Sequence, residues 1–385
     1  MPVSPFILVS ATYPPHVGGV DNYTSEMVQA LLRRGERVIL VTSAINGLPG
    51  EEHTGLLTIR RIPTKWLVDM RLPIILPGKA WRKLKKELKR EQDARVLIQT
   101  YLYPLSLAMA FFSFRQKWFS ILLCHGSQYV CSGSGFVDRV EHLYERIMAR
   151  LVGAFSQKCC AVSNASGAWL RALHLPFSGT LPPAIDLNMV RSSLAACPTM
   201  RAEGGLLSGD GVIRIAFVGR MIREKGICQL IDAVGILREQ GYPLTLTAMG
   251  DGPLLDELRD NAPEGVHFTG RLSRAEVLRQ LAAHDCFCLP SDSEGFPLSA
   301  VEAAACGCYE ILAPVGGAAE LIPDISFGYP MRGNSREDII DAIKYVFENR
   351  TQCAYAAQKC KERILQAYSS WENACSQLIA AFDRS

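Results

Sequence analysis

Two glutamates, Glu294 and Glu302, are the residues of this chain best suited to chemistry, and they stand eight positions apart. A carboxylate accepts hydrogen bonds, so each glutamate can hold hydroxyl groups of a bound molecule. The residues directly after the first glutamate would meet the same molecule; they are Gly295, Phe296, Pro297 and Leu298. The alternative is that Glu302 is a solvated helix residue with no ligand.

The elements that would position these residues are a strand, a turn and a helix. Cys286–Leu289 is apolar and strand-like, Pro297 suits the first position of a helix, and Gly307 suits its C-cap. Backbone N–H groups at such a helix start, with the positive end of the helix dipole, favour a phosphate. The carboxylates would repel that phosphate but bind hydroxyls on either side of it. The pattern predicts a site for a hexose, a diphosphate and a ribose, as in a nucleotide-sugar.

Basic residues follow a second predicted strand, Ile213–Val218. Arg220 and Lys225 come between that strand and a helix starting at Ile227, where a guanidinium fork and an ammonium could hold a diphosphate. The alternative is a solvated basic loop. Arg271 ends another strand and is a weaker candidate for contact with a nucleotide base.

The first half of the chain offers a glycine pair and a histidine. Gly18 and Gly19 lie between the first strand and a helix, where the missing side chains would let the backbone approach a ligand. A plain turn explains them equally well. His125 follows the strand Phe119–Cys124 and could face a ligand, although a lone histidine is more often structural.

Strands alternate with amphipathic helices in both halves, which predicts a parallel sheet in each. The chain of 385 residues suits two domains, and the glycine-rich stretch 191–211 is the predicted linker. The remaining predicted strands are Phe6–Ser10, Arg37–Thr42, Val96–Thr100, Lys158–Val162, Leu244–Ala248, Val266–Thr269 and Tyr309–Ala313.

Composition narrows the class of protein. A hydrophobic content of 48% indicates a folded protein, and the 13 scattered cysteines predict reduced, buried thiols rather than disulfides or a zinc site. No basic segment precedes the first strand, so no signal peptide is predicted. The longest apolar run, Leu105 to Phe114, is too short to span a bilayer. These features predict a cytoplasmic protein.

The positive charge is concentrated in the first half, where residues 1–190 hold 22 Lys and Arg against 13 Asp and Glu. Residues 79–90 form a basic helix on which Trp81, Leu84 and Leu88 share one face. One hypothesis is docking on the anionic inner face of a membrane, with Trp81 as a shallow anchor. The alternative is a surface helix whose apolar residues pack on the sheet. No nucleic-acid-reading module accompanies the patch.

The chain resembles the retaining glycosyltransferases of the GT-B fold and is similar to glycosyltransferase family 4. The resemblance covers residue 6 to about residue 372. The matching motifs are Pro-Pro-x-x-Gly-Gly (14–19), His-Gly (125–126), Val-Ser (162–163), Ile-Asp (185–186), Gly-Arg-x-x-x-x-Lys-Gly (219–226), Gly-x-Gly-Pro (250–253), Phe-x-Gly (268–270), Pro-Ser-x-x-Glu-Gly-Phe-Pro-Leu (290–298), Glu-Ala-x-Ala-x-Gly (302–307) and Gly-Gly-x-x-Glu (316–320).

The resemblance implies an α/β protein with two Rossmann-like, doubly wound parallel-sheet domains facing a central cleft. It implies an acceptor-side domain over residues 1–195, a nucleotide-sugar domain over 205–367, and a C-terminal helix over about 368–385 that crosses back to the first. Two departures leave the nucleotide open between UDP and GDP. Glu310 stands in a segment where the family often has Gly-Thr-Pro-Val-Val, and Pro182-Pro183-Ala184 replaces the common Asn-Gly.

The resemblance also implies roles for the candidate residues. Arg220 and Lys225 would hold the diphosphate, Glu294 the transferred sugar and Glu302 the ribose, while Gly18, Gly19 and His125 match positions that line the donor. The implied reaction is retaining transfer of a sugar to a hydroxyl of a sugar or lipid-linked sugar, in cell-surface polysaccharide or glycolipid biosynthesis. No cofactor or metal is expected. The alternatives are a GT-B-like nucleotide-sugar epimerase and a non-catalytic nucleotide-sugar-binding subunit.

Overall fold

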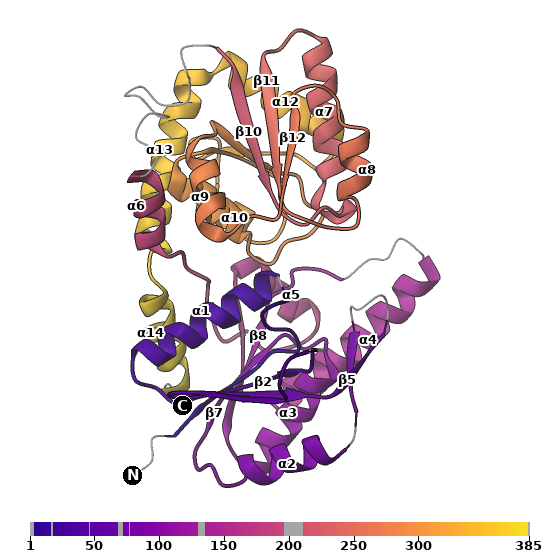
Figure 1. The fold of residues 1–385 in the computed structure, drawn as a ribbon, viewed down its shortest axis with the longest axis vertical. Coiled ribbons are helices and arrows are strands. Elements are labelled where there is room, and N and C mark those ends of the chain that lie inside the picture. Colours follow the sequence, from indigo (N-terminus) through magenta and orange to yellow (C-terminus); the bar gives the residue numbers. More distant parts are fainter. Residues whose placement is uncertain are drawn as a thin grey trace. The chain divides into compact units, whose positions relative to one another are not determined.

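The computed structural model describes residues 4–16, 18–45, 47–67, 72–76, 78–129, 135–195 and 211–383, and it divides into two compact units (Figure 1). The first unit runs to Pro183 and resumes at Trp371, and the second runs from Ala184 to Ser370. Each unit contains its own parallel sheet and its own hydrophobic core.

The sheet of the first unit has seven strands in the order β3-β4-β2-β1-β7-β8-β9 and is parallel except for β3. Every residue of β2 is buried, as expected for a parallel strand covered on both faces. The strands are β1 (Phe6–Val9), β2 (Val38–Ser43), β3 (Glu51–Thr54), β4 (Leu57–Ile62), β7 (Arg95–Gln99), β8 (Phe119–Cys124) and β9 (Lys158–Ala161), with a separate antiparallel pair of β5 (Thr64–Leu67) and β6 (Leu72–Ile75). The helices are α1 (Gly19–Arg33), α2 (Lys79–Leu88), α3 (Pro104–Gln116), α4 (Gly135–Ala154), α5 (Asn164–Ala172) and α14 (Trp371–Asp383).

The sheet of the second unit has six parallel strands in the order β12-β11-β10-β13-β14-β15. Its order reverses beside β10, the first strand of the unit, which is the switch point where doubly wound sheets bind ligands. The strands are β10 (Ile213–Val218), β11 (Leu244–Met249), β12 (Val266–Gly270), β13 (Cys286–Leu289), β14 (Tyr309–Leu312) and β15 (Tyr329–Pro330). The helices are α6 (Leu187–Ala195), α7 (Ile227–Glu239), α8 (Leu255–Asp260), α9 (Arg274–Ala282), α10 (Leu298–Cys306), α11 (Ala318–Leu321), α12 (Arg336–Glu348) and α13 (Arg350–Ala367), with a 3-10 turn, η1, at Arg223–Lys225.

The strands predicted from the sequence are all present, with ends that differ by a single residue at most. The domain boundary differs from the expected residue 195, because α6 packs against α9 and α10 of the second unit. The same helix occupies the start of the predicted linker 191–211, whose residues 196–210 lie outside the described residues.

The last helix, α14, belongs to the first unit and starts at Trp371 rather than at about residue 368. It packs on α1, where the Trp371 ring meets Tyr23 edge to face at 5.4 Å between centroids. At its other end Phe382 meets Phe6 at 5.7 Å. These aromatic contacts hold the end of the chain on the sheet of the first unit.

Three further expectations concern thiols, membrane spans and the basic helix. Among the described residues every cysteine is free, and all but Cys228 are buried. No described helix is long and apolar enough to cross a membrane. On α2, Leu84 and Leu88 are buried and Trp81 packs against the same core, so the apolar face of this helix lies on the sheet. Trp81 is therefore not the exposed anchor that the sequence suggested.

Candidate functional site

In the second unit the two predicted ligand loops follow β10 and β13, which are neighbours in the sheet. The loops fit closely because Gly226 has a φ of +70° and a side chain there would place Cβ 2.0 Å from the Pro290 carbonyl oxygen. The Asp292 N–H also donates to the Glu224 carbonyl at 2.9 Å. These contacts hold the two loops together at the carboxyl edge of the sheet.

Lys225 and Glu294 meet across these loops. The Lys225 Nζ donates to Glu294 Oε1 at 2.5 Å, and the Ser291 hydroxyl donates to the same oxygen at 2.8 Å. The side chains are 24% and 12% exposed, so the pair is partly screened from water but open at the surface. The residues that the sequence assigned to a diphosphate and to a sugar are therefore in contact with each other.

Glu302 forms a second ion pair, with Arg274. The Arg274 Nε donates to Glu302 Oε1 at 2.6 Å, and the glutamate side chain is only 12% exposed. Glu302 is thus not the solvated helix residue of the alternative interpretation. Arg274 was missed by the sequence reasoning. Its signal was the capping box of Ser273 and Glu276, which places Arg274 at the first position of α9.

The start of α10 separates the two glutamates. Pro297 is the N-cap and not the first helical residue, so α10 starts one residue later than predicted. The first intrahelical hydrogen bonds run from the N–H groups of Ala300 and Val301 to the Pro297 carbonyl. The N–H groups of Leu298 and Ser299 precede those bonds, in the part of a helix that favours an anion. Gly307 ends the helix with a φ of +87°, as its predicted capping role requires.

A second glycine pair supports the backbone of the Glu294 loop. At Gly316 an added Cβ would lie 1.8 Å from the Glu294 carbonyl oxygen, and the Gly317 N–H donates to the Gly295 carbonyl at 3.0 Å. Phe296 packs against the ring of Tyr368 at 5.2 Å between centroids. The turn between the two glutamates is therefore fixed by the contacts of Gly316 and Gly317 with its backbone and by the packing of Phe296 on Tyr368.

Arg220 follows β10 and Arg271 follows β12, the two strands on either side of β11, and both arginines are exposed. Gly219, before the first arginine, donates to Met249, and Gly250 donates to Gly270, before the second. Neither guanidinium has an ion-pair or hydrogen-bond partner among the described residues. The structure thus places both arginines at the edge of the sheet that carries the glutamate loops, but not in contact with the glutamates.

In the first unit the glycine pair opens α1. Gly18 is the N-cap in an extended conformation and Gly19 is the first helical residue, where an added Cβ would meet no atom within 4 Å. The helix start also holds a buried carboxylate that the sequence reasoning missed: Asp21 is 1% exposed and lies 2.5 Å from Nδ1 of His16. Its signal was the acidic residue in the first turn of α1.

His125 has protein partners on two sides. Its Nε2 lies 2.6 Å from Oε1 of Gln99, and its ring meets Tyr23 edge to face at 5.1 Å. Exclusion of water lowers the pKa of His125 to about 3. The imidazole is therefore neutral at ordinary pH and can donate or accept a hydrogen bond but carries no charge.

Two family models match the chain, one for each unit. Residues 17–188 match Glycosyltransferase Family 4, and residues 204–363 match Glycosyl transferases group 1. The described clusters of His, Cys, Asp and Glu include none that could hold a metal ion.

Relatives of known name are similar along the whole chain. A GDP-mannose-dependent alpha-(1-6)-phosphatidylinositol monomannoside mannosyltransferase of Mycobacterium tuberculosis is 24% identical over 98% of this chain and 97% of its own length. One subunit of the human phosphatidylinositol N-acetylglucosaminyltransferase is likewise 24% identical, over 98% of this chain and 75% of its own. The crystal structure of Anabaena HepE with UDP-glucose is 16% identical, covers 99% of this chain and 100% of its own, and has a TM-score of 0.74. The chain therefore belongs to the glycosyltransferases of the GT-B fold that join a family 4 domain to a group 1 domain.

Proposed function

We propose that this glycosyltransferase uses a UDP- or GDP-linked sugar as donor and transfers the sugar, with retention at the anomeric carbon, to a hydroxyl of a lipid-linked acceptor. The carrying observation is the arrangement of Lys225, Glu294 and Glu302 around the start of α10. Lys225 pairs with Glu294, Arg274 pairs with Glu302, and the helix start with its backbone donors lies between the two glutamates along the chain, which would suit a diphosphate between a hexose and a ribose.

In the proposed reaction the bond from the anomeric carbon to the diphosphate breaks and a bond from the same carbon to the acceptor oxygen forms. The acceptor proton passes to an oxygen of the leaving diphosphate on the same face of the sugar, so no enzyme nucleophile is needed. Negative charge grows on the diphosphate as the bond breaks. Arg220, Lys225 and the N–H groups at the start of α10 are the groups that would stabilise this charge.

Glu294 and Glu302 would select the two hydroxyl-bearing ends of the donor. Each is mostly buried and pairs with a cation through Oε1, and a carboxylate has further lone pairs that can accept hydrogen bonds from hydroxyls. Glu294 would take hydroxyls of the transferred sugar, and Glu302 those of the ribose. Arg271, at the end of β12, would lie on the nucleotide side.

The lipid-linked acceptor is supported by the relatives. The mycobacterial and human proteins are both named for phosphatidylinositol-based acceptors. The donor base is either guanine or uracil, because the mycobacterial enzyme is named for GDP-mannose and the HepE crystal contains UDP-glucose. The basic helix α2 supports a peripheral position on an anionic membrane, where cations are attracted to the surface.

The test is a panel of UDP- and GDP-sugars measured first by thermal shift, since a ligand that binds the folded state raises its melting temperature. The nucleotide-sugar that gives the largest shift is then incubated with the enzyme and a membrane lipid extract. The anomeric configuration of the product is read by NMR. Retained configuration and an acceptor-dependent product support the proposal. An epimerised nucleotide-sugar formed without acceptor, or no shift with any donor, would contradict it.

A further inference from the structure

The basic helix α2 cannot by itself insert into a membrane. Its apolar residues Leu84 and Leu88 are each 2% exposed and belong to the core. The cation of Lys85 lies over the Trp81 ring, 5.6 Å from its centroid. Trp81 is only partly exposed, so the outer side of α2 offers much charge and little apolar surface, and stable attachment to a bilayer needs a second, apolar contribution.

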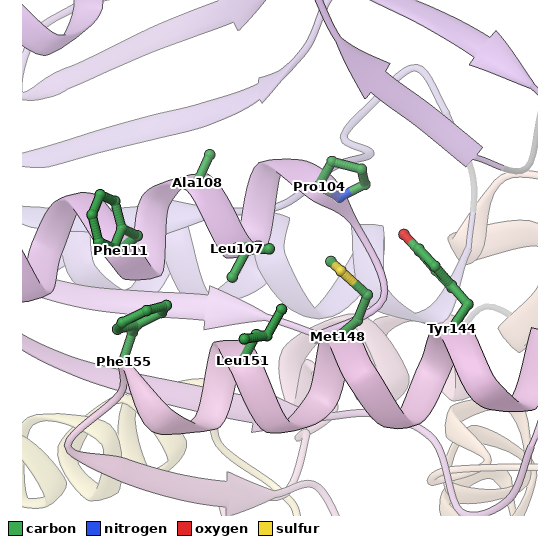
Figure 2. A pocket seen from close by; sticks show the side chains of 8 residues that line it. All are labelled: Pro104, Leu107, Ala108, Phe111, Tyr144, Met148, Leu151 and Phe155. Atoms are coloured by element: carbon green, nitrogen blue, oxygen red, sulfur yellow. The ribbon is translucent and has the colours of Figure 1, made fainter.

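An apolar groove lies beside α2, between α3 and α4 (Figure 2). Its volume is about 390 Å³, and Figure 2 shows Phe111 of α3 facing Phe155, which follows α4. Among the lining residues only Tyr144 has a polar side-chain oxygen, and that hydroxyl donates to the Leu102 carbonyl at 2.8 Å. The groove thus presents apolar atoms to whatever occupies it.

The apolar surface continues along the outer side of α4. The side chains of Val140, Leu143, Ile147 and Leu151 are 54%, 59%, 49% and 40% exposed, and their spacing places them in one stripe. Four large exposed apolar side chains in a row on one helix are unusual for a surface that faces only water.

Arginines border this stripe on one edge. Arg139, Arg146 and Arg150 recur at seven and four residues, which places them beside the stripe on the exposed surface of α4. The acidic residues of this helix, Asp138, Glu141 and Glu145, fall on its inward side by the same spacing, and Glu145 is buried against Tyr101. The exposed face of α4 therefore combines apolar side chains with positive charge.

A basic hollow of about 580 Å³ adjoins the groove and shares Ala108 and Phe111 with it. The cations that line it are Arg82, Lys85 and Lys86 of α2, Lys89 at the end of α2, and Arg115 of α3. Lys83 is not among them, because its Nζ lies 2.9 Å from Glu51 on the other side of the helix. Charge and apolar surface are thus contiguous.

We propose that α2, α3 and α4 together bind an anionic phospholipid bilayer. The groove and the α4 stripe enter the boundary between headgroups and acyl chains, and the basic hollow contacts lipid phosphates. This inference rests on the proposed membrane position of the enzyme and adds the apolar contact that α2 lacks. A second copy of the chain is a poor occupant, because two such faces would bring their arginines and lysines together.

Binding is tested by flotation of the full chain with vesicles of phosphatidylglycerol and phosphatidylcholine. The double variant Leu143→Asp, Ile147→Asp alters only exposed side chains and should reduce the partition coefficient roughly tenfold or more, because it removes apolar area that enters the bilayer. Leu56→Asp is the matched control, since Leu56 is 46% exposed in the same unit but lies in the turn between β3 and β4. It should bind like wild type.

The charged part is tested by the variant Arg82→Gln, Lys85→Gln, Lys86→Gln, Lys89→Gln. Its binding should fall by roughly a hundredfold at low salt and respond less to added salt, since its cations are the groups that salt screens. The matched control Lys83→Gln should have a smaller effect than any one of the other four changes.

Insertion is tested directly by Leu143→Trp and Leu56→Trp with lipids brominated on their acyl chains. Added quenching at position 143 but not at position 56 supports the proposal. Equal vesicle binding by wild type and the Leu143→Asp, Ile147→Asp variant would overturn it, and so would a wild-type dimer that this variant dissociates. Nucleotide-sugar binding is measured on the same variants without vesicles. If the wild-type chain binds no nucleotide-sugar, the proposed function is contradicted. If it binds a nucleotide-sugar but does not float with the vesicles, only the membrane site is contradicted.

Discussion

The ammonium of Lys225 lies 2.5 Å from Oε1 of Glu294, so the loop after β10 and the loop after β13 are joined by an ion pair. In the proposed reaction these two loops hold neighbouring parts of one donor, the diphosphate and the sugar. A diphosphate that accepts a hydrogen bond from Lys225 has to share the ammonium with Glu294, which links recognition of the phosphate to the position of the carboxylate.

The variant Glu294→Gln should keep its affinity for the nucleoside diphosphate and lose turnover with the intact donor. Its proposed partner is a sugar hydroxyl, which the bare diphosphate lacks, and the change also frees Lys225 from its counter-charge. Calorimetry with nucleoside diphosphate and with donor, together with steady-state kinetics, checks this. An equal loss of affinity for both ligands would show that Glu294 does not act on the sugar.

Arg220→Ala and Lys225→Ala should each lower turnover by roughly a hundredfold, the scale for removing one preorganised donor to a developing charge. Arg220 is exposed, so its replacement should leave the melting temperature unchanged. Lys225→Ala should also cost stability, because Glu294 keeps Ser291 as a hydrogen-bond donor but loses its cation.

The matched control for both changes is Arg259→Ala on α8, an arginine whose side chain is 50% exposed. It should leave kinetics unaltered. Near-normal turnover in Arg220→Ala and Lys225→Ala would remove both residues from the diphosphate site.

Much of the fold could be predicted because the strands are short apolar runs bounded by glycine, proline or charge. The sheet edge that carries the loops followed from the same pattern, since parallel strands point their carboxyl ends one way. The segment of β3 to β6 was not predicted, because β3 consists of polar residues, β4 mixes polar with apolar residues, and β6 contains a proline, which argues against a strand.

The contacts within the site could not be predicted in the same way. Arg274 and Glu302 belong to different helices, and only the packing of α9 on α10 brings them to 2.6 Å. The stripe on α4 has a similar cause. An apolar period along a helix normally marks its buried face, whereas here Val140 and Leu143 are exposed and Ala149 and Val152 are buried.

Activity should survive EDTA. The predicted diphosphate site contains Arg220 and Lys225, whose two positive charges can offset the charge of the diphosphate without a cation. Turnover is measured with the preferred donor after dialysis against chelator, with and without added Mg²⁺. Complete inactivation that Mg²⁺ reverses would mean that a divalent ion, not the two side chains alone, stabilises the leaving group.

The last prediction concerns Glu310, the charged residue on β14, the strand next to the edge strand β15. The side chain is fully buried, and neither carboxylate oxygen has a hydrogen-bond partner among the described residues. Burial raises the pKa of Glu310 well above its usual range, and burial likewise raises the pKa of the neighbouring Cys360 thiol. The carboxyl therefore keeps its proton to a higher pH in the folded chain than in the unfolded chain, where it ionises near pH ~4.3.

The sign of the pH effect follows from proton binding. Between pH ~4.3 and the raised pKa the folded state holds one more proton than the unfolded state, so this group makes the free energy of unfolding fall as pH rises. Glu310→Gln stays neutral and should remove that dependence. Its melting temperature should match wild type near pH ~4.5 and exceed it increasingly towards pH ~8, by up to several degrees. Glu264→Gln, at a side chain that is 93% exposed, is the control and should run parallel to wild type. A difference between Glu310→Gln and wild type that is constant with pH, or that shrinks as pH rises, would mean that Glu310 is charged within the fold.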